Sequence, residues 1–456
     1  MRITVEAKIE RADGSRQTVE IFCLERAPDP APRCGIGVLL SESRDLLGNL
    51  QRVVLREQAD EIVAAARQCR RCSQRLAVKG SAGIVYRTAF GKVTLEAPRL
   101  YSRCSACGAR VAASMSCSPL ALALPERSHP QWVWLQTRYA SVMSYKLARS
   151  FLATGFAGAM DLRASSIRSS AQRIGARLEK EMQQRAEAFW TLHHDDAAID
   201  ARAAVHALQI DAGYVRSVPQ TEGASWISVI ASKVVRPESQ RTHAHAYAGG
   251  GTLWRGDRQE AFLASVGIGG DVPVVLLCDG GEDVGVARLG NRSLRILDWF
   301  HIGMRFRHLQ LALKGLPGVD DAERERLLRR AEGAKWLLWH GRAESCLARL
   351  QELRRDTGWV GKRNALGALA ANLENGKACL TNYAARRARG LPISSAGAES
   401  AVDHVVGQRM KRNGHARWTR RGANHLLQVR CAVLNGQDVR NFKRWYPTQR
   451  PLATAS

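Results

Sequence analysis

A carboxylate follows an apolar segment in the stretch His206-Ala-Leu-Gln-Ile-Asp211-Ala-Gly-Tyr-Val215. The apolar residues before Asp211 predict a buried β-strand, and the small residue and glycine after it are typical of a strand end. A lone aspartate after a strand is more often a turn residue than a ligand. Asp211 therefore gains functional meaning only if a second carboxylate occurs in the same setting.

The same pattern recurs in Val272-Pro-Val-Val-Leu-Leu-Cys278, which is followed by Asp279, Gly280 and Gly281. Neighbouring strands could bring Asp211 and Asp279 to one end of a sheet. Two such carboxylates can bridge a pair of metal ions about 3.5–4 Å apart. Oxygen ligands favour Mg²⁺ or Mn²⁺ over zinc. The two strands therefore predict a catalytic two-metal site.

A third carboxylate is expected to complete the metal shell, and Glu399 is our choice. It precedes an amphipathic helix in which Val402, Val405 and Val406 face inward. Glu282 and Asp283 are local alternatives, because they follow Asp279 closely in the sequence.

Two CxxC pairs lie further towards the N-terminus, Cys69-Arg-Arg-Cys72 and Cys104-Ser-Ala-Cys107. The intervening residues predict a hairpin with Gly91 at its turn, which could bring the four thiolates around one Zn²⁺. Four buried free cysteines are the alternative. Because all four positions would be filled by protein, we expect a structural zinc rather than a catalytic one.

The composition favours a polyanionic partner. There are 68 Lys and Arg against 42 Asp and Glu, a formal net charge of +26 spread along the chain, which indicates nucleic acid rather than a membrane surface. The longest apolar runs have strand length, so no membrane partner is expected. The paired cysteines predict a reducing, cytoplasmic location.

Two regions carry candidate DNA-binding residues. Residues 125–195 predict three helices with a basic last helix, which resembles a helix-turn-helix. A solvated linker helix is the alternative. Residues 404–444 contain ten Lys and Arg against one acid, Asp438. The candidate phosphate contacts are Arg168, Arg173, Arg177, Arg409, Lys411, Arg412, Arg420 and Arg421. Residues 440–456 suggest a flexible basic tail.

Several motifs in fixed order resemble bacterial insertion-sequence transposases of the IS-Kra group, relatives of the Mutator-like transposases. The motifs are the CxxC pairs, Leu124-Pro-Glu-Arg127 with His129-Pro130, Gln209-Ile-Asp211-Ala-Gly213, Leu277-Cys-Asp279-Gly280, Asp298-Trp-Phe-His301 and Glu399-Ser-Ala-Val402. The resemblance implies a DDE transposase with an RNase H-like core, and Asp211, Asp279 and Glu399 as its metal-binding triad. It also places His301 near the active site; a capping or core histidine is the alternative.

The expected fold class is therefore a multi-domain α+β protein. An N-terminal α/β segment (1–65), a zinc ribbon (66–118) and a helix-turn-helix-like region (125–195) would precede an α/β RNase H-like catalytic domain. That domain would comprise residues 205–303 and 393–436, interrupted by an all-helical insertion at 304–392, with a basic tail at 437–456. In the insertion, Trp336 and Trp339 could stack on an unpaired base, but their spacing is more typical of core.

The function that these features predict is DNA transposition in the bacterial cytoplasm, at the nucleoid. The partners would be double-stranded DNA, as terminal inverted repeats and as target, and further copies of the chain in a homo-oligomer on DNA. An RNase H-like nuclease without strand transfer and a non-catalytic DNA-binding protein derived from a transposase are the alternatives.

Overall fold

The computed structural model describes residues 1–11, 13–26, 37–192, 204–218, 225–236, 239–249, 255–279, 292–359, 364–394, 402–411 and 416–447. The protein is α+β, and it divides into two compact units. The first comprises Met1–Ser170 and Val439–Ser456, and the second comprises Ala171–Asp438.

The first unit begins with the antiparallel hairpin β1 (Arg2–Glu10) and β2 (Arg16–Glu25), as its alternating sequence predicts. The long helix α1 (Leu40–Arg67) follows. A second hairpin, β3 (Val78–Thr88) and β4 (Gly91–Tyr101), is joined by the short strand β5 (Ser116–Cys117). Alternate residues of the hairpin, including Tyr86 and Leu95, pack against Leu55 of α1 and form the core of this part.

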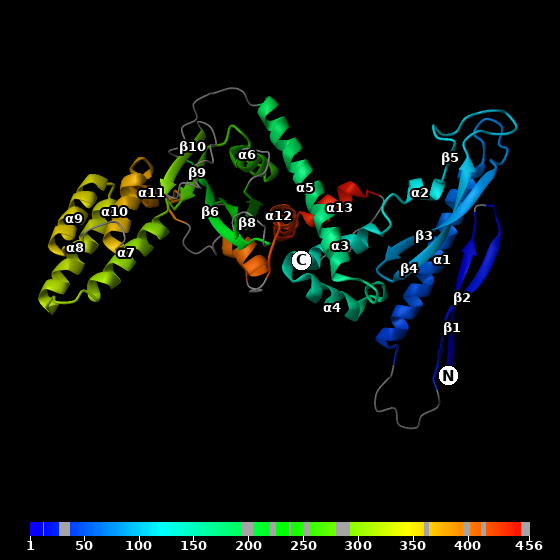
Figure 1. The fold of residues 1–456 in the computed structure, drawn as a ribbon, viewed down its shortest axis with the longest axis horizontal. Helices are drawn as coiled ribbons and strands as arrows, with labels where there is room; N and C mark the ends of the chain where they lie inside the picture. The colour runs from blue at the N-terminus through cyan, green and yellow to red at the C-terminus, as the bar shows by residue number, and fades with distance from the viewer. Residues whose placement is uncertain are drawn as a thin grey trace. The chain divides into compact units, whose positions relative to one another are not determined.

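Three helices follow where the sequence predicts them, α3 (Pro130–Val142), α4 (Tyr145–Gly155) and α5 (Ala164–Leu192) (Figure 1). Two short helical elements are additional, α2 (Pro119–Ala123) and η1 (Ala157–Ala159). Ser144 caps α4, because its hydroxyl accepts a hydrogen bond from the Leu147 N–H. The first turns of α5 belong to the first unit, and the helix continues into the second.

A mixed five-stranded sheet forms the centre of the second unit. Its strands are β6 (His206–Arg216), β7 (Trp226–Arg236), β8 (Ser239–Ala248), β9 (Val274–Cys278) and β10 (Ser293–Leu297). The spatial order is β10-β9-β6-β7-β8. The first three strands in sequence run antiparallel to one another, whereas β9 and β10 run parallel to β6.

The two faces of the sheet are covered by different elements. Leu208 and Ile210 of β6 share one buried cluster with Phe262 and Leu263 of α6 (Arg255–Ser265). The residues that alternate with them point to the opposite face. There Gly213 lies so close to Val402 that an added Cβ would stand 2.6 Å from the valine Cγ1. Val402 immediately precedes the π-helix η6 (Asp403–Lys411).

Helix α12 (Arg420–Leu434) protects the outer edge of β8 with side-chain amides. Asn435 accepts from the Ala244 N–H and donates to its carbonyl, both at 2.8 Å. Gln428 donates to the Ala246 carbonyl at 3.0 Å, and the Ala248 N–H donates to Asn424 at 3.2 Å. Because these amides take the place of a sixth strand, the edge offers little for pairing with another chain.

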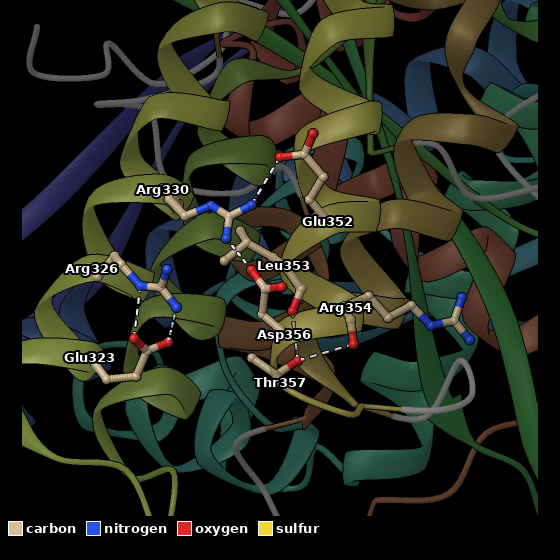
Figure 2. Close-up of polar contacts among 8 residues, drawn as sticks. All are labelled: Glu323, Arg326, Arg330, Glu352, Leu353, Arg354, Asp356 and Thr357. Atoms are coloured by element: carbon tan, nitrogen blue, oxygen red, sulfur yellow. Dashed lines mark hydrogen bonds and ion pairs between the residues drawn. The ribbon is translucent and has the colours of Figure 1, made fainter.

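A group of helices connects β10 to η6: α7 (Trp299–Lys314), α8 (Asp321–Trp339), α9 (Ala343–Asp356), α10 (Ala365–Asn375), η5 (Lys377–Cys379) and α11 (Tyr383–Ala388). Figure 2 shows Arg330 of α8 reaching Glu352 and Asp356 of α9. Such exposed pairs contribute little stability. The main contribution comes from buried leucines, which are continuous with the core of the sheet.

The chain does not continue as a flexible tail directly after α12. Helix α13 (Asp438–Trp445) forms instead, so the expectation of flexibility is wrong for these residues. The reason is the spacing of Phe442, Trp445 and Tyr446, which brings the Phe442 ring into contact with each of the other two. The Tyr446 hydroxyl also donates to Glu126 at 2.9 Å. Within the described ranges, no helix combines the length and the apolar character needed to cross a membrane.

Candidate metal centres

The four cysteines of the CxxC pairs converge in the first unit. Their sulfur atoms all lie within 4.8 Å of one another. The Cys69–Cys107 and Cys72–Cys104 sulfurs are each 3.6 Å apart. Four sulfurs at about 2.3 Å from a tetrahedral Zn²⁺ would be separated by roughly 3.8 Å. The cluster could therefore hold a structural zinc ion, as the spacing predicts.

Two backbone turns of the same design position these sulfurs. In the first, the Ser73 N–H donates to the Cys69 carbonyl and the Cys69 N–H to the Gln74 carbonyl. In the second, the Gly108 N–H donates to the Cys104 carbonyl and the Cys104 N–H to the Ala109 carbonyl. The pKa of Cys69 falls to about 6, because the Arg71 and Cys72 N–H groups donate to its sulfur. This favours the thiolate form of Cys69 that a metal requires, whereas the hydrogen bond with Cys107 and burial raise the pKa of Cys72 to about 12.

The strand register brings Asp211 and Asp279 to equivalent positions on adjacent parallel strands. β6 pairs with β9 from His206↔Val274 to Gln209↔Leu277. Continuing the same offset for two residues sets Asp211 beside Asp279, on strands about 4.8 Å apart. Ala207, Val275 and Leu277 alternate with them on the same face and share a buried cluster. Both aspartates are half-buried.

The sequence predicted that the strand carrying Asp211 ends at this residue, but β6 continues to Arg216. Asp211 thus lies within a strand, where its backbone is fixed on the β7 side by pairing with Ala231. Asp279 comes directly after the last residue of β9. This difference means that Asp211 is held more firmly than a turn residue would be.

Asp298 occupies the third equivalent position. β10 pairs with β9 up to Leu297↔Cys278, so the next residues are Asp298 and Asp279. The buried Asp298 caps α7, accepting from the Phe300 N–H at 2.9 Å, and its other oxygen lies 3.0 Å from His301 Nδ1. The sequence motif contained both residues, but only the register reveals that Asp298 aligns with the other aspartates.

His301 is the titratable group most affected by these carboxylates. Its pKa is raised, first by the hydrogen bond with Asp298 and then by the negative charges of Asp298, Asp279 and Asp211, although burial opposes the shift. The side chain remains 41% exposed. His301 is therefore a partly accessible imidazole that is biased towards its charged form.

Residues of the helical segment hold the ends of β9 and β10. Asn372 of α10 donates to the Asp279 carbonyl at 3.1 Å. The Tyr383 hydroxyl donates to the Leu297 carbonyl at 2.9 Å, and the Trp299 N–H donates to the Ile393 carbonyl at 3.0 Å. Nothing in the sequence pattern singled out Asn372, because its partner is a backbone atom of a strand far away in the chain.

Glu399, Glu282, Asp283 and Arg412 lie outside the described residues. Val402, Val405 and Val406 are buried, as the amphipathic pattern predicts. Within the part of the chain that the structure describes, the four cysteines are the one cluster of three or more candidate ligands with closely spaced ligand atoms. His245 is buried between Tyr247 and Phe262 and belongs to no such cluster there.

The candidate phosphate contacts differ in exposure. Arg168 and Arg173 of α5, Lys411 at the end of η6, and Arg420 and Arg421 at the start of α12 are exposed. Arg177 is half-exposed and lies 3.7 Å from Glu181. Arg409 is 2% exposed, with its guanidinium over the Trp418 ring at 5.5 Å.

Helices α5 and α12 pack closely in the second unit, which brings Arg173 and Arg421 to neighbouring elements. Gln172 donates to the Gly422 carbonyl at 3.0 Å and lies 3.2 Å from His425 Nδ1. An added Cβ on Gly175 would stand 2.2 Å from the His425 carbonyl oxygen. Only glycine permits this approach.

The two tryptophans of α8 occupy different environments. Trp339 packs against Trp299 and Tyr383, with ring centroids 4.8 Å and 6.5 Å away. Trp336 is 48% exposed and lies edge-on to Trp339.

Neither the scan against protein-family models nor the search of curated proteins returns a match for this sequence.

Proposed function

We propose that this chain is the DNA transposase of a bacterial insertion sequence, which cuts the ends of its element and joins them to a target. The observation that carries the proposal is the in-register pair Asp211 and Asp279. Beside them lies His301, whose pKa is raised mainly by its hydrogen bond with Asp298 and further by their charges. Three antiparallel strands followed by two parallel ones are also the arrangement of an RNase H-like sheet, which supports the same conclusion.

The metal ligands in this proposal are Asp211, Asp279 and Glu399. Two Mg²⁺ or Mn²⁺ ions bound there would activate the attacking oxygen and stabilise the leaving oxygen. Val402, three residues after Glu399, packs beside Gly213 on the Asp211 face of β6, which supports Glu399 as the third ligand. Asp298 orients His301, and the protonated ring can donate from Nε2 to a phosphate oxygen beside the carboxylates.

DNA would be held by the exposed cations. Arg173 of α5 and Arg420 and Arg421 of α12 belong to two packed helices, and the N-terminus of α12 adds the positive end of its dipole. Arg168 and Lys411 extend the basic surface along their own elements. The buried Arg409 is left out, because its guanidinium is packed on Trp418. Since two ends must be cut together, we expect a homo-oligomer on DNA.

The test combines purified zinc-loaded protein, Mg²⁺ and a labelled duplex taken from either flank of the coding sequence. We expect metal-dependent nicking that exposes a 3′-hydroxyl, and joined product when a target plasmid is added. Asp279→Asn should abolish both reactions. Asp271→Asn is the matched control, because this exposed aspartate precedes β9 without reaching its carboxyl end.

Each alternative function has its own outcome. Nicking without joined product would indicate a nuclease that lacks strand transfer. Salt-sensitive binding with no cleavage by either protein, under Mg²⁺ or Mn²⁺, would indicate a DNA-binding protein and overturn the proposal.

A further inference from the structure

β6 and β7 continue past Asp211 as a two-stranded ribbon. Their pairing runs to Arg216↔Trp226, whereas β9 pairs with β6 only up to Gln209 and β8 pairs with β7 only up to Val229. One face of the ribbon is buried: Val215 and Ile227 are almost inaccessible. The same face includes Gly213, which packs against Val402.

The opposite face carries exposed aromatic rings. Tyr214 is 49% exposed and Trp226 is 51% exposed. Arg216, two residues after Tyr214 on the same face, is paired directly with Trp226, and its guanidinium lies 5.6 Å from the indole centroid. Two accessible aromatic rings and an arginine on one strand pair therefore mark a candidate binding surface.

The chemistry of this surface fits an unpaired nucleobase. Bases stack on tryptophan and tyrosine without regard to sequence, and arginine adds a planar cation that also attracts the phosphate. Further exposed cations lie next to the ribbon along the chain, since Trp418 pairs with Arg216 through the backbone and is flanked by Arg417 and Arg420. These arginines make the surface too strongly charged to favour an apolar protein partner.

We infer that Tyr214, Arg216 and Trp226 form a stacking site for unpaired bases of single-stranded DNA. These residues lie three to five positions beyond Asp211 on the same hairpin, about 10–17 Å along the strand. Asp211 points to the opposite face of β6. The inference deepens the proposed function, on which it rests: the site would take unpaired bases of a strand that passes round the ribbon from the carboxylates. Its test measures binding without cleavage, so the two proposals can fail separately.

The experiment uses the full-length, zinc-loaded protein and a fluorescein-labelled oligothymidylate of fifteen nucleotides, without added Mg²⁺. Fluorescence anisotropy compares Trp226→Phe, which retains a stacking ring, with Trp226→Leu, which retains apolar bulk alone. We expect Trp226→Leu to bind the single strand about tenfold more weakly and Trp226→Phe to stay near the wild-type affinity. Binding to a duplex of equal length should change by less than about twofold, since duplex bases are already stacked.

Trp336→Leu is the matched control, because this tryptophan is 48% exposed and also lies beside a cation, Lys335. Unchanged single-strand binding by Trp226→Leu would overturn the inference. An equal loss on single strand and duplex, or equal losses in the Phe and Leu variants, would overturn it as well, because the indole would then act through the fold rather than by stacking. A loss seen only in Trp336→Leu would assign stacking to α8 instead.

Discussion

Ser73 and Gly108 occupy the same position in the two cysteine turns, one residue after the second cysteine. Both have left-handed backbone, with φ of 59° and 68°. Glycine adopts this conformation without strain, whereas a residue with a Cβ does so at a cost of roughly 1–2 kcal/mol. The two turns therefore have the same geometry but not the same strain.

This asymmetry predicts unequal effects of substitution on zinc binding. Gly108→Ala should weaken zinc affinity about fivefold, since the strain costs about 1 kcal/mol. Ser73→Gly should leave affinity equal or slightly higher. Competition with a chromophoric chelator measures both, and Gly80→Ala is the control, because an added Cβ there meets open space. Equal effects at the two turns would contradict the prediction.

His245 is fully enclosed, and burial lowers its pKa to about 3, with the Arg258 charge contributing. In the unfolded chain its pKa is about 6.5. Below about pH 6.5, His245 is therefore protonated in the unfolded state but stays neutral in the folded state. Above about pH 6.5, His245 does not contribute to the pH dependence of stability. As the pH falls from about 6.5 to about 3, it progressively lowers the free energy of unfolding.

Replacing His245 should reduce acid sensitivity. Between pH 7.5 and 5.5 the wild type should lose about 1.4 kcal/mol more unfolding free energy than His245→Phe, which keeps a ring against Phe262. Denaturant titrations at the two pH values measure the difference. His308→Gln, at an exposed position on α7, should retain the wild-type slope. Parallel slopes for wild type and His245→Phe would mean that the histidine is hydrated or charged in the folded state.

At the scale of elements, the helical segment is connected to the carboxylates by Asn372. Because its amide holds the Asp279 carbonyl, Asn372 is a positioning residue rather than a ligand. If the proposed function holds, Asn372→Ala should raise the Mg²⁺ concentration for half-maximal cleavage several-fold, as loss of one hydrogen bond of about 1 kcal/mol implies. The melting temperature should change little.

Asn364→Ala provides the comparison for Asn372→Ala. Asn364 caps the same helix, accepting from the Gly367 N–H at 2.7 Å, so its loss weakens α10 by about 1 kcal/mol without touching β9. Should both variants shift the Mg²⁺ requirement equally, Asn372 would act only through helix stability.

The sequence was informative where local periodicity decides the element. The alternating residues of β1 to β4, the apolar strands before Asp211 and Asp279, and the CxxC spacing predicted the corresponding structure. It was uninformative where the partner is distant. The alignment of Asp298 with Asp279 depends on which parallel strands are neighbours, and the amides of α12 bind the backbone of β8, so neither leaves a local pattern. Helix α13 was missed because its basic residues suggested a flexible tail, and the helical spacing of its aromatic residues was not considered.

At the scale of the whole molecule, the cysteine cluster and the carboxylates belong to different units. Around the cysteines the buried apolar residues are few, with Leu76 and Leu100 the main ones. The second unit has a large continuous core that runs from the sheet through the connecting helices. A small core depends on its metal for folding, whereas a large one does not.

Zinc removal should therefore unfold only part of the protein. After treatment with a zinc chelator, we expect backbone amides of residues 66–118 to exchange with deuterium at least about tenfold faster, while those of β6 keep their protection. Hydrogen-exchange mass spectrometry resolves the two regions. Cys104→Ser should reproduce the effect without chelator. Cys117→Ser should not, because this half-buried cysteine lies in the same unit but outside the cluster. Faster exchange in β6 as well would show that the cluster stabilises both units, and unchanged exchange everywhere would show that the four cysteines fold without a metal.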